Sequence, residues 1–205
     1  MKVLLINGSP HPRGCTYTAL SEVAKTLNEQ GIETEIFQVG HQAIRGCIAC
    51  GQCRQNGKCV FDDLVNEAAP KFKACDGLVV GSPVYYASAN GTLISFLDRL
   101  FYSAAVDKTM KVGAAVVSCR RGGASATFDE INKYFTISGM PVASSQYWNS
   151  VHGNTAEEVL KDQEGLQVMR TLGRNMAFLI KSIALGKETF GLPEKEVKVS
   201  TNFIR

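Results

Sequence analysis

Four cysteines lie close together in the sequence, at positions that could surround one small metal centre. They follow the pattern C-x2-C-x2-C-x5-C and are Cys47, Cys50, Cys53 and Cys59. Thiolate ligands select zinc or iron–sulfur clusters. Two successive x2 spacings are more typical of [4Fe–4S] ligands than of a paired zinc-ribbon arrangement. The pattern favours an iron–sulfur cluster, with structural zinc, a regulatory disulfide and free thiols as alternatives.

The segment NGSPHPRGCTYT, residues 7–18, has the composition of a phosphate-binding loop. It follows an apolar run and precedes apolar residues at helical spacing, so we expect a strand, a tight loop and a helix. It is neither G-x-G-x-x-G nor Walker A, because Gly8 and Gly14 are one residue too far apart and Cys15 stands at the lysine position. Backbone amides, hydroxyls and Arg13 would then hold a monophosphate better than a triphosphate. The alternative is an ordinary turn.

Two further loops have residues suited to a flat, partly apolar ring. Residues 82–86, SPVYY, offer an aromatic wall that proline stiffens, and residues 118–123, SCRRGG, end in glycines that allow close backbone approach. The alternative for the two tyrosines is core packing, which we expect for one of them. Arg120 or Arg121 could meet an anionic group, with solvated charge as the alternative.

Composition limits the class of protein. The chain has 205 residues, 45% hydrophobic and 20% charged, which is typical of one globular domain. Because no apolar run is long enough for a membrane span and the first residues predict a strand, we expect neither a membrane protein nor a signal peptide. The net charge of +3 is too small to indicate nucleic-acid binding. Seven cysteines without an export signal favour a cytoplasmic protein with reduced thiols.

Apolar runs predict five strands, at residues 3–6, 34–39, 77–81, 112–117 and, weakly, 141–143. Helical spacing predicts a helix after each of the first four strands: one that ends near Glu29, one capped by Asp62, one at 92–102 and one after Gly123. A long final helix is expected to begin at a capping box of Thr155 and Glu158 and to end at Gly186. Residues 144–153 are expected to form a loop, in which Trp148 either packs in the core or covers a ligand or a partner subunit.

Strands that alternate with helices predict a parallel sheet with helices on both faces. We expect an α/β fold of three layers, α/β/α, with a flavodoxin-like, doubly wound sheet of five strands in the order 2-1-3-4-5. The expected unit is a single domain over residues 1–205, with a cysteine-rich loop at about 46–61 and a polar tail from about 186. In this topology the three loops converge beyond the carboxyl ends of the strands, where such sheets bind ligands.

The chain resembles the NADPH-dependent FMN reductase family of flavodoxin-like proteins. The motifs that carry the resemblance occur in matching order: Gly8-Ser9-Pro10 with Gly14, Thr16 and Thr18; Gly81-Ser82-Pro83-Val84-Tyr85-Tyr86; Asn90-Gly91; and Phe96-Leu97-Asp98-Arg99. The resemblance implies that the first loop holds the FMN phosphate, that the second borders the isoalloxazine ring, and that the third completes the pocket. The implied cofactor-binding residues are Ser9, Arg13, Cys15, Thr16, Tyr17, Thr18, Pro83, Val84, Tyr85, Tyr86, Ser118, Gly122 and Gly123.

The cysteine pattern resembles that of the iron–sulfur flavoprotein branch of this family, which implies a [4Fe–4S] cluster beside FMN. Cys15 departs from the commoner family pattern, in which a polar side chain often stands at this position.

The leading hypothesis is an FMN-dependent oxidoreductase that passes electrons from NAD(P)H to a small acceptor such as a quinone or free flavin. It needs no catalytic acid–base pair, because the flavin performs the hydride chemistry. The second hypothesis is an electron carrier that links FMN and a [4Fe–4S] cluster to ferredoxin-like partners. The third is a flavin-free sensor that uses the thiols. The resemblance also implies a homodimer or homotetramer.

Overall fold

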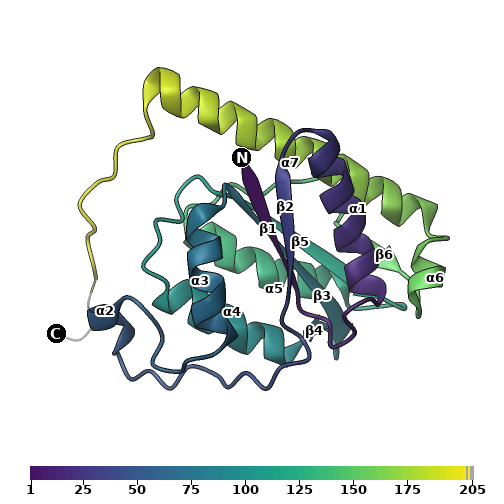
Figure 1. Cartoon of the computed structure of the whole chain (residues 1–205), viewed down its shortest axis with the longest axis horizontal. Coiled ribbons are helices and arrows are strands. Elements are labelled where there is room, and N and C mark those ends of the chain that lie inside the picture. Colours follow the sequence, from purple (N-terminus) through teal and green to yellow (C-terminus); the bar gives the residue numbers. More distant parts are fainter. Residues whose placement is uncertain (202, 204–205) are drawn as a thin grey trace.

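A computed structural model of the chain describes residues 1–201 and residue 203. Five parallel strands form a twisted sheet in the order β2-β1-β3-β5-β6, and a short β4 pairs antiparallel with the end of β3 (Figure 1). The strands are β1 (Lys2–Asn7), β2 (Glu33–Gln38), β3 (Gly77–Tyr85), β4 (Ser88–Ala89), β5 (Val112–Cys119) and β6 (Ser150–His152). The predicted flavodoxin-like α/β class is confirmed. When β4 is set aside, the parallel strands follow the predicted order.

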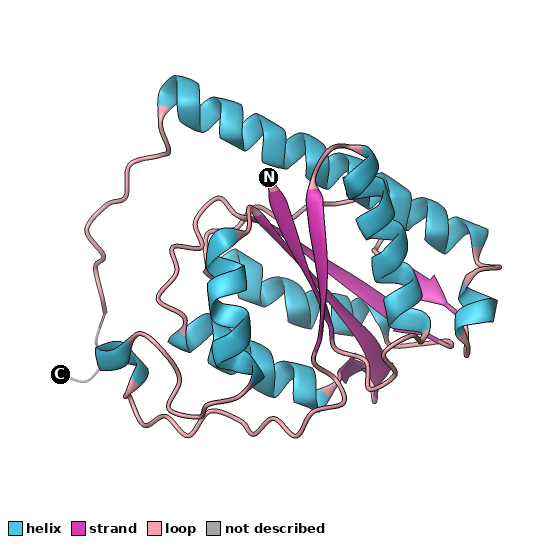
Figure 2. Cartoon of the chain, in the orientation of Figure 1, coloured by secondary structure: helices cyan, strands magenta, loops and turns pink. Residues whose placement is uncertain are grey.

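Helices cover both faces of this sheet (Figure 2). They are α1 (Cys15–Glu29), α2 (Cys53–Asn56), α3 (Leu64–Ala74), α4 (Gly91–Ser103), α5 (Ala124–Ile137), α6 (Ala156–Val159) and α7 (Gln163–Phe190). On β1, Val3 and Leu5 pack toward α1 and α7, whereas Leu4 and Ile6 pack toward α3, α4 and α5. Successive side chains of a strand point to opposite faces, so the unbroken apolar run of β1 reflects a strand that is covered on both sides.

The predicted position of the last strand was wrong. Val142 makes only an isolated bridge to Gly113, whereas residues 150–152 pair with β5 as β6. The buried Asn149 holds the start of β6, because its side-chain amide donates to the carbonyl of Ala115 at 3.1 Å. This strand has three residues and one buried side chain, Val151, so it lacks the apolar pattern that a sequence search detects.

Two predicted helix starts and one predicted helix end were also wrong. Thr155 caps only the four-residue α6, and α7 begins after Asp162, whose side chain accepts from the Gly165 N–H at 2.9 Å. Asp63, and not Asp62, caps α3. α7 continues through Gly186 to Phe190, so the tail begins at Gly191. Asn202, Ile204 and Arg205 of the predicted tail lie outside the described residues.

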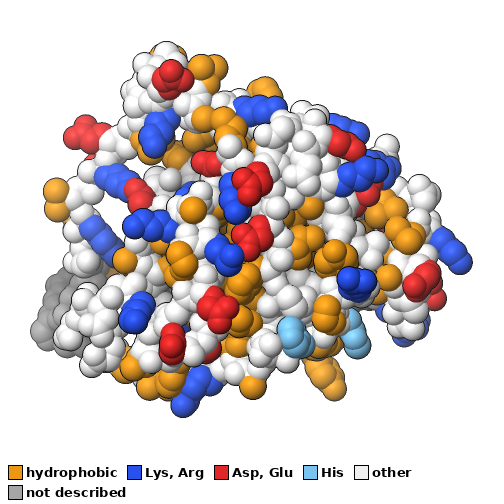
Figure 3. Space-filling view, in the orientation of Figure 1, with side chains coloured by type: hydrophobic (Ala, Val, Ile, Leu, Met, Phe, Trp, Pro, Cys, Tyr) orange, Lys and Arg blue, Asp and Glu red, His pale blue; other side chains and the backbone are white. Residues whose placement is uncertain are grey.

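The surface carries both signs of charge. Lys and Arg side chains are interspersed with Asp and Glu over the face in Figure 3, and no large area of this face has one sign. No helix in residues 1–201 has the length and apolar character needed to cross a membrane.

Candidate functional site

The carboxyl ends of β1, β3 and β5 bring the three predicted loops together around one cleft. Its volume is about 240 Å³. The strand register explains the convergence, because Asn7 pairs with Gly81 and Pro83 pairs with Ser118. Of the thirteen predicted cofactor-binding residues, the cleft is lined by Ser9, Cys15, Thr16, Pro83, Val84, Tyr85 and Ser118.

A buried polar network fixes the first loop. The Asn7 side chain donates to the Gln38 side chain at 2.6 Å and accepts from the Ser9 N–H at 3.1 Å. Gln38 in turn donates to the Ser9 carbonyl at 2.7 Å. Gly40 lies against the same loop so closely that a Cβ there would stand 2.2 Å from the Gly8 carbonyl oxygen. The position of the loop is therefore set by β1, β2 and the turn after β2.

The start of α1 has the features of an anion site. Among the described hydrogen bonds, none uses the backbone N–H of Cys15, Thr16 or Tyr17, and Gly14 provides no side-chain cap. Unused N–H groups at a helix start favour a bound anion, since the helix dipole has its positive end there. The hydroxyls of Thr16 and Ser118 lie 2.8 Å apart, which joins α1 to the end of β5.

The surroundings of the two cysteines of the cleft disfavour the thiolate form. Burial raises the pKa of Cys15, and nearby Glu157 and Glu158 add to the increase. Burial likewise raises the pKa of Cys119. Cys15 donates weakly to the Gly153 carbonyl, with the sulfur 3.7 Å from the oxygen. Neither side chain therefore brings negative charge to a site that would hold a phosphate.

Six predicted residues lie outside the cleft lining: Arg13, Tyr17, Thr18, Tyr86, Gly122 and Gly123. Arg13, Tyr86 and Gly122 are exposed, and the Thr18 hydroxyl donates to the Gly14 carbonyl. The expected core packing of one tyrosine was wrong, since Tyr85 is 43% exposed and Tyr86 is fully exposed. Trp148 is 55% exposed, so it does not pack in the core either.

Four further residues line the cleft that were not predicted as site residues: His11, Cys119, Gly153 and Asn154. Arg120, one of the two arginines predicted as candidates for an anionic group, lines the cleft as well. Gly153 and Asn154 reach the cleft because β6 extends the sheet beside β5. Residues 144–153 were expected to form a loop, so nothing in the sequence predicted that Gly153 would lie beside the end of β5.

The hairpin that forms the aromatic wall turns through two non-glycine residues in left-handed conformation. Tyr86 has φ 52° and Ala87 has φ 59°, between the paired strand ends Tyr85 and Ser88. Such two-residue turns favour Asn-Gly, because a Cβ costs energy at positive φ.

We therefore expect Ala87→Gly to raise the free energy of unfolding by about 0.5 to 1 kcal/mol. Urea denaturation would measure the change. Ala105→Gly, in an exposed loop without positive φ, is the control and should destabilise slightly. An Ala87→Gly variant that is less stable than the parent would contradict the assignment of strain to this turn.

Gly123 has a structural role against this hairpin. It has φ 93°, and a Cβ would stand 2.8 Å from the Ala87 Cα and 2.8 Å from a Val84 methyl group. The adjacent Gly122 has open space around its Cα.

We expect Gly123→Ala to cost about 2 kcal/mol of stability, from positive φ and from the clash. Gly122→Ala should stay within about 0.5 kcal/mol of the parent. Thermal and urea unfolding of the pair would test the difference, and equal stabilities would refute it.

The four-cysteine loop forms a second pocket, between the start of α3 and the end of α4. All four cysteines line it, together with residues that include Ile48, Phe61, Arg99 and Tyr102. None of the seven cysteines is joined in a disulfide in this structure. Within the described residues, no three potential ligands already stand in a metal-binding arrangement, and the enclosed space is about 20 Å³.

The donor set of this pocket nevertheless fits an iron–sulfur cluster. Four thiols on one apolar pocket match the chemistry of a cluster, and the loop is shaped by positive φ at Ala49 and Gly51. Binding of a cluster would require the loop to move outward, because the present space admits about one water molecule.

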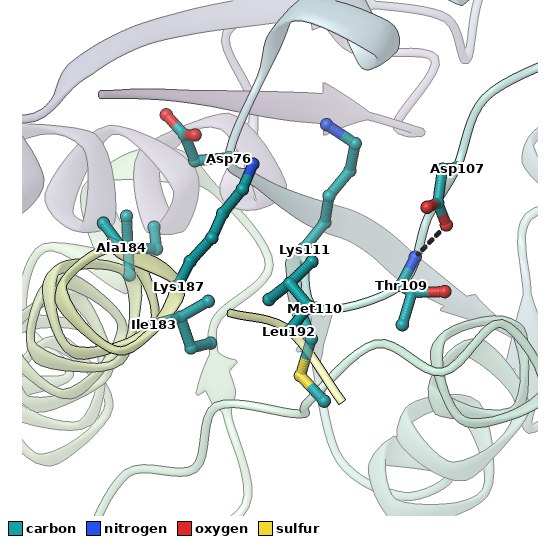
Figure 4. A pocket seen from close by; sticks show the side chains of 10 residues that line it. Asp76, Asp107, Thr109, Met110, Lys111, Ile183, Ala184, Lys187 and Leu192 are labelled. Atoms are coloured by element: carbon teal, nitrogen blue, oxygen red, sulfur yellow. Dashed lines mark hydrogen bonds between the residues drawn. The ribbon is translucent and has the colours of Figure 1, made fainter. Parts of the chain in front are cut away.

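A third, larger cavity of about 390 Å³ lies at the opposite end of the sheet. Its walls are the residues before β3 and β5, with Ile183, Ala184 and Lys187 of α7 facing them (Figure 4). Its charged side chains are exposed or half-exposed, and none of the three predicted loops reaches it. We therefore assign no ligand to this cavity.

Comparison with known proteins identifies the family. A family model described as NADPH-dependent FMN reductase matches residues 1–155. An iron–sulfur flavoprotein of Methanocaldococcus jannaschii is 34% identical over 191 residues, which cover 89% of this chain and 99% of the relative. An iron–sulfur flavoprotein of Methanosarcina thermophila is 28% identical over 193 residues, which cover 92% of this chain and 100% of the relative.

Solved structures agree on the fold. A flavone reductase superposes with a TM-score of 0.68 at 19% identity, over 90% of this chain and 64% of the other. An archaeal flavodoxin superposes with a TM-score of 0.61 at 16% identity, over 88% of this chain and 99% of the other. At such low identity these structures support the flavodoxin-like fold alone. With the family match, the chain belongs to the NADPH-dependent FMN reductase family, in the branch of the iron–sulfur flavoproteins.

Proposed function

We propose that this chain is an FMN-dependent oxidoreductase that passes electrons from NAD(P)H to a small acceptor such as a quinone or free flavin. One observation carries the proposal: Cys15 and Thr16, whose N–H groups are unused at the start of α1, line the same cleft as the wall of Pro83, Val84 and Tyr85. An anion-binding helix start beside a partly apolar wall suits a ligand with a phosphate at one end and a flat ring at the other. FMN has this form, and membership of the family supports the same cofactor.

The residues of the cleft divide into two groups under this proposal. Ser9 and the N–H groups of residues 15–17 would hold the phosphate, and the exposed Arg13 would add positive charge beside it. Pro83, Val84 and Tyr85 would cover one face of the ring and exclude water from it. The flavin itself supplies the hydride chemistry when it is bound, so the protein contributes binding and orientation.

The test is turnover by protein that has been fully loaded with FMN. NADPH and NADH oxidation would be followed with a quinone and with free flavin as acceptors. Turnover with either donor supports the proposal. No oxidation of either donor, with any acceptor and with FMN at one per chain, would reject it.

A second candidate is an electron carrier between FMN, a [4Fe–4S] cluster and a ferredoxin-like protein. The four-cysteine pocket supports it, and so does the charge of the loop around that pocket. Between residues 45 and 61 the charged side chains are Arg45, Arg54 and Lys58, all cationic and all exposed. Ile48 and Val60 on the same loop are about half exposed, at 50% and 53%. An apolar surface with positive charge suits an acidic partner protein.

Anaerobic purification would separate the two candidates. An absorption spectrum, with iron and sulfide assays on the same sample, should show flavin bands plus about four irons per chain if the carrier is correct. Salt-sensitive reduction by an acidic ferredoxin would support the partner class. A sample that shows flavin bands but contains no iron or sulfide would favour the simple reductase over the electron carrier.

We also propose that the chain forms a homodimer or homotetramer. α7 exposes Phe178, Leu185 and Phe190 at 70%, 65% and 86%. Exposed apolar side chains of this size favour an interface. Light scattering at working concentration tests this, and a monomer mass would reject it.

A further inference from the structure

Arg99 of α4 is the largest fully buried side chain of the described residues, with 1% of its surface exposed. A buried arginine is rare and is normally held by several acceptors. α4 presents this cation to the four-cysteine pocket, which Arg99 helps to line. Burying a charge is costly, so the contacts of Arg99 must compensate for the lost hydration.

Those contacts join the two ends of the cysteine loop. Nη1 and Nη2 donate to the two carboxylate oxygens of Asp63 at 2.6 and 2.9 Å. Nη1 also donates to the carbonyl of Arg45 at 3.3 Å, and Nη2 to that of Phe61 at 3.4 Å. Arg45 precedes the first cysteine of the loop, whereas Phe61 and Asp63 follow the last one.

Arg99 also donates to a sulfur, from Nε and from a shared hydrogen bond of Nη2. Nε and Nη2 of Arg99 both lie 3.2 Å from Sγ of Cys59. Cys59 is thus the only one of the four cysteines whose sulfur receives a side-chain hydrogen bond in the described residues; the Cys47 sulfur accepts only from the Ala49 N–H, at 3.4 Å. A fork of two N–H groups from one cation fixes the position of this sulfur as well as its electrostatic surroundings.

Asp63 does not fully neutralise the positive charge of Arg99. Its Oδ1 also accepts from the Val65 N–H at 3.1 Å, as the cap of α3. Asp63 is 29% exposed at its side chain, whereas Arg99 is buried. Water therefore screens the carboxylate more than the guanidinium, which leaves the Cys59 sulfur facing a net positive group.

We propose that Arg99 is a positioning residue for the iron–sulfur cluster, holding the Cys59 sulfur as a ligand and raising the reduction potential of the cluster through two hydrogen bonds to that sulfur. This inference rests on the second candidate function, because it requires a cluster in the loop. Hydrogen bonds to ligand sulfurs and nearby charge are among the factors that set such potentials. A cation beside the sulfur favours the reduced cluster, because reduction adds one negative charge.

The test compares anaerobically purified variants by redox titration. Arg99→Lys keeps the charge but cannot supply the fork. Arg99→Gln combined with Asp63→Asn removes both charges of the buried pair and retains an amide that can cap α3. In each we expect a tenfold shift of the reduction equilibrium toward the oxidised cluster, about 59 mV for one electron. The flavin potential, read in the same titration, should stay within error.

Arg54→Gln is the matched control. Arg54 lies on the same loop and is exposed, and its guanidinium donates to the Tyr102 hydroxyl at 2.9 Å without contacting a sulfur. Its removal should leave the cluster potential unchanged. Equal shifts of the cluster potential in the Arg54 and Arg99 variants would overturn the proposal, because they would show that any nearby positive charge has the same effect. Iron-containing Arg99 variants with the parent potential would overturn it too. Parent protein without iron would reject the carrier function first, before any variant is compared.

Discussion

Replacing Gly40 with alanine should lower the free energy of unfolding by about 3 kcal/mol and abolish most FMN binding. Gly40 lies in the turn after β2 and packs on the backbone of the first loop. Its Cβ would stand 2.2 Å from the Gly8 carbonyl oxygen and 2.3 Å from the Ser9 carbonyl carbon. These are backbone atoms, so no side chain can rotate away to relieve the clash. The first loop must move as a whole.

The loss of binding follows from the hydrogen bonds that this movement breaks. Ser9 is held by Asn7 and Gln38 at 3.1 and 2.7 Å. A displacement of the loop by more than about half an ångström misplaces the donors that a phosphate requires. Flavin content after purification, FMN titration by fluorescence quenching and urea unfolding would measure both effects.

Gly46→Ala is the control for this substitution. Gly46 is exposed, and its nearest neighbour would be 4.0 Å from the new Cβ, at the Ser95 hydroxyl. We expect its stability and FMN affinity to match those of the parent. A Gly40→Ala variant that binds FMN with the parent affinity would show that the first loop does not hold the phosphate.

Under the proposed carrier function, replacing Cys50 with serine should reduce the iron content from about four per chain to less than one, with the flavin content unchanged. Cys50 is exposed in the loop that contains α2, so the substitution has little structural cost. Serine supplies a hard oxygen in place of a soft thiolate, which iron–sulfur clusters disfavour. Iron, sulfide and flavin assays on one anaerobic preparation would measure the result.

Cys75→Ala is the control for this second substitution. Cys75 is buried at the end of α3, outside the four-cysteine pocket, and burial raises its pKa. The variant should lose some stability and no iron. Full iron in the Cys50 variant would contradict the assignment of Cys50 as a ligand. If the parent protein contains one zinc per chain and no sulfide, the loop holds a structural zinc site and not an iron–sulfur cluster.

The parts of the fold that the sequence predicted are those with strong local patterns. β1 has an unbroken apolar run because it is buried on both faces, and α1 has apolar residues at helical spacing because one side packs on the sheet. β6 escaped prediction, since its place depends on pairing with β5 and on the buried Asn149, and neither contact leaves a pattern in Ser150-Val151-His152.

The site likewise contains residues that a local sequence pattern predicted and residues that only tertiary contacts place. Four cysteines at close spacing favour a metal centre in any fold, but the contacts of Arg99 were not predicted, because Arg99 entered the sequence analysis only as part of the motif Phe96-Leu97-Asp98-Arg99. It stands between inward-facing Phe96, Leu97 and Leu100, where an arginine ordinarily predicts the solvent-facing side of a helix. Its burial depends on Asp63 and Cys59, which lie about forty residues earlier in the chain.

The distribution of apolar contacts has a consequence for the protein without metal. Of the four cysteines in the loop, only Cys59 packs against a hydrophobic core, and among the described residues no other member of the loop at 45–61 belongs to either core. The base of the loop is closed by the contacts of Arg99 with Asp63 and Arg45. Small domains whose ligands form the core unfold when a chelator removes their metal. If the loop holds the proposed cluster, a chelator should empty the loop and leave the flavodoxin-like domain folded, so that the cluster could be restored.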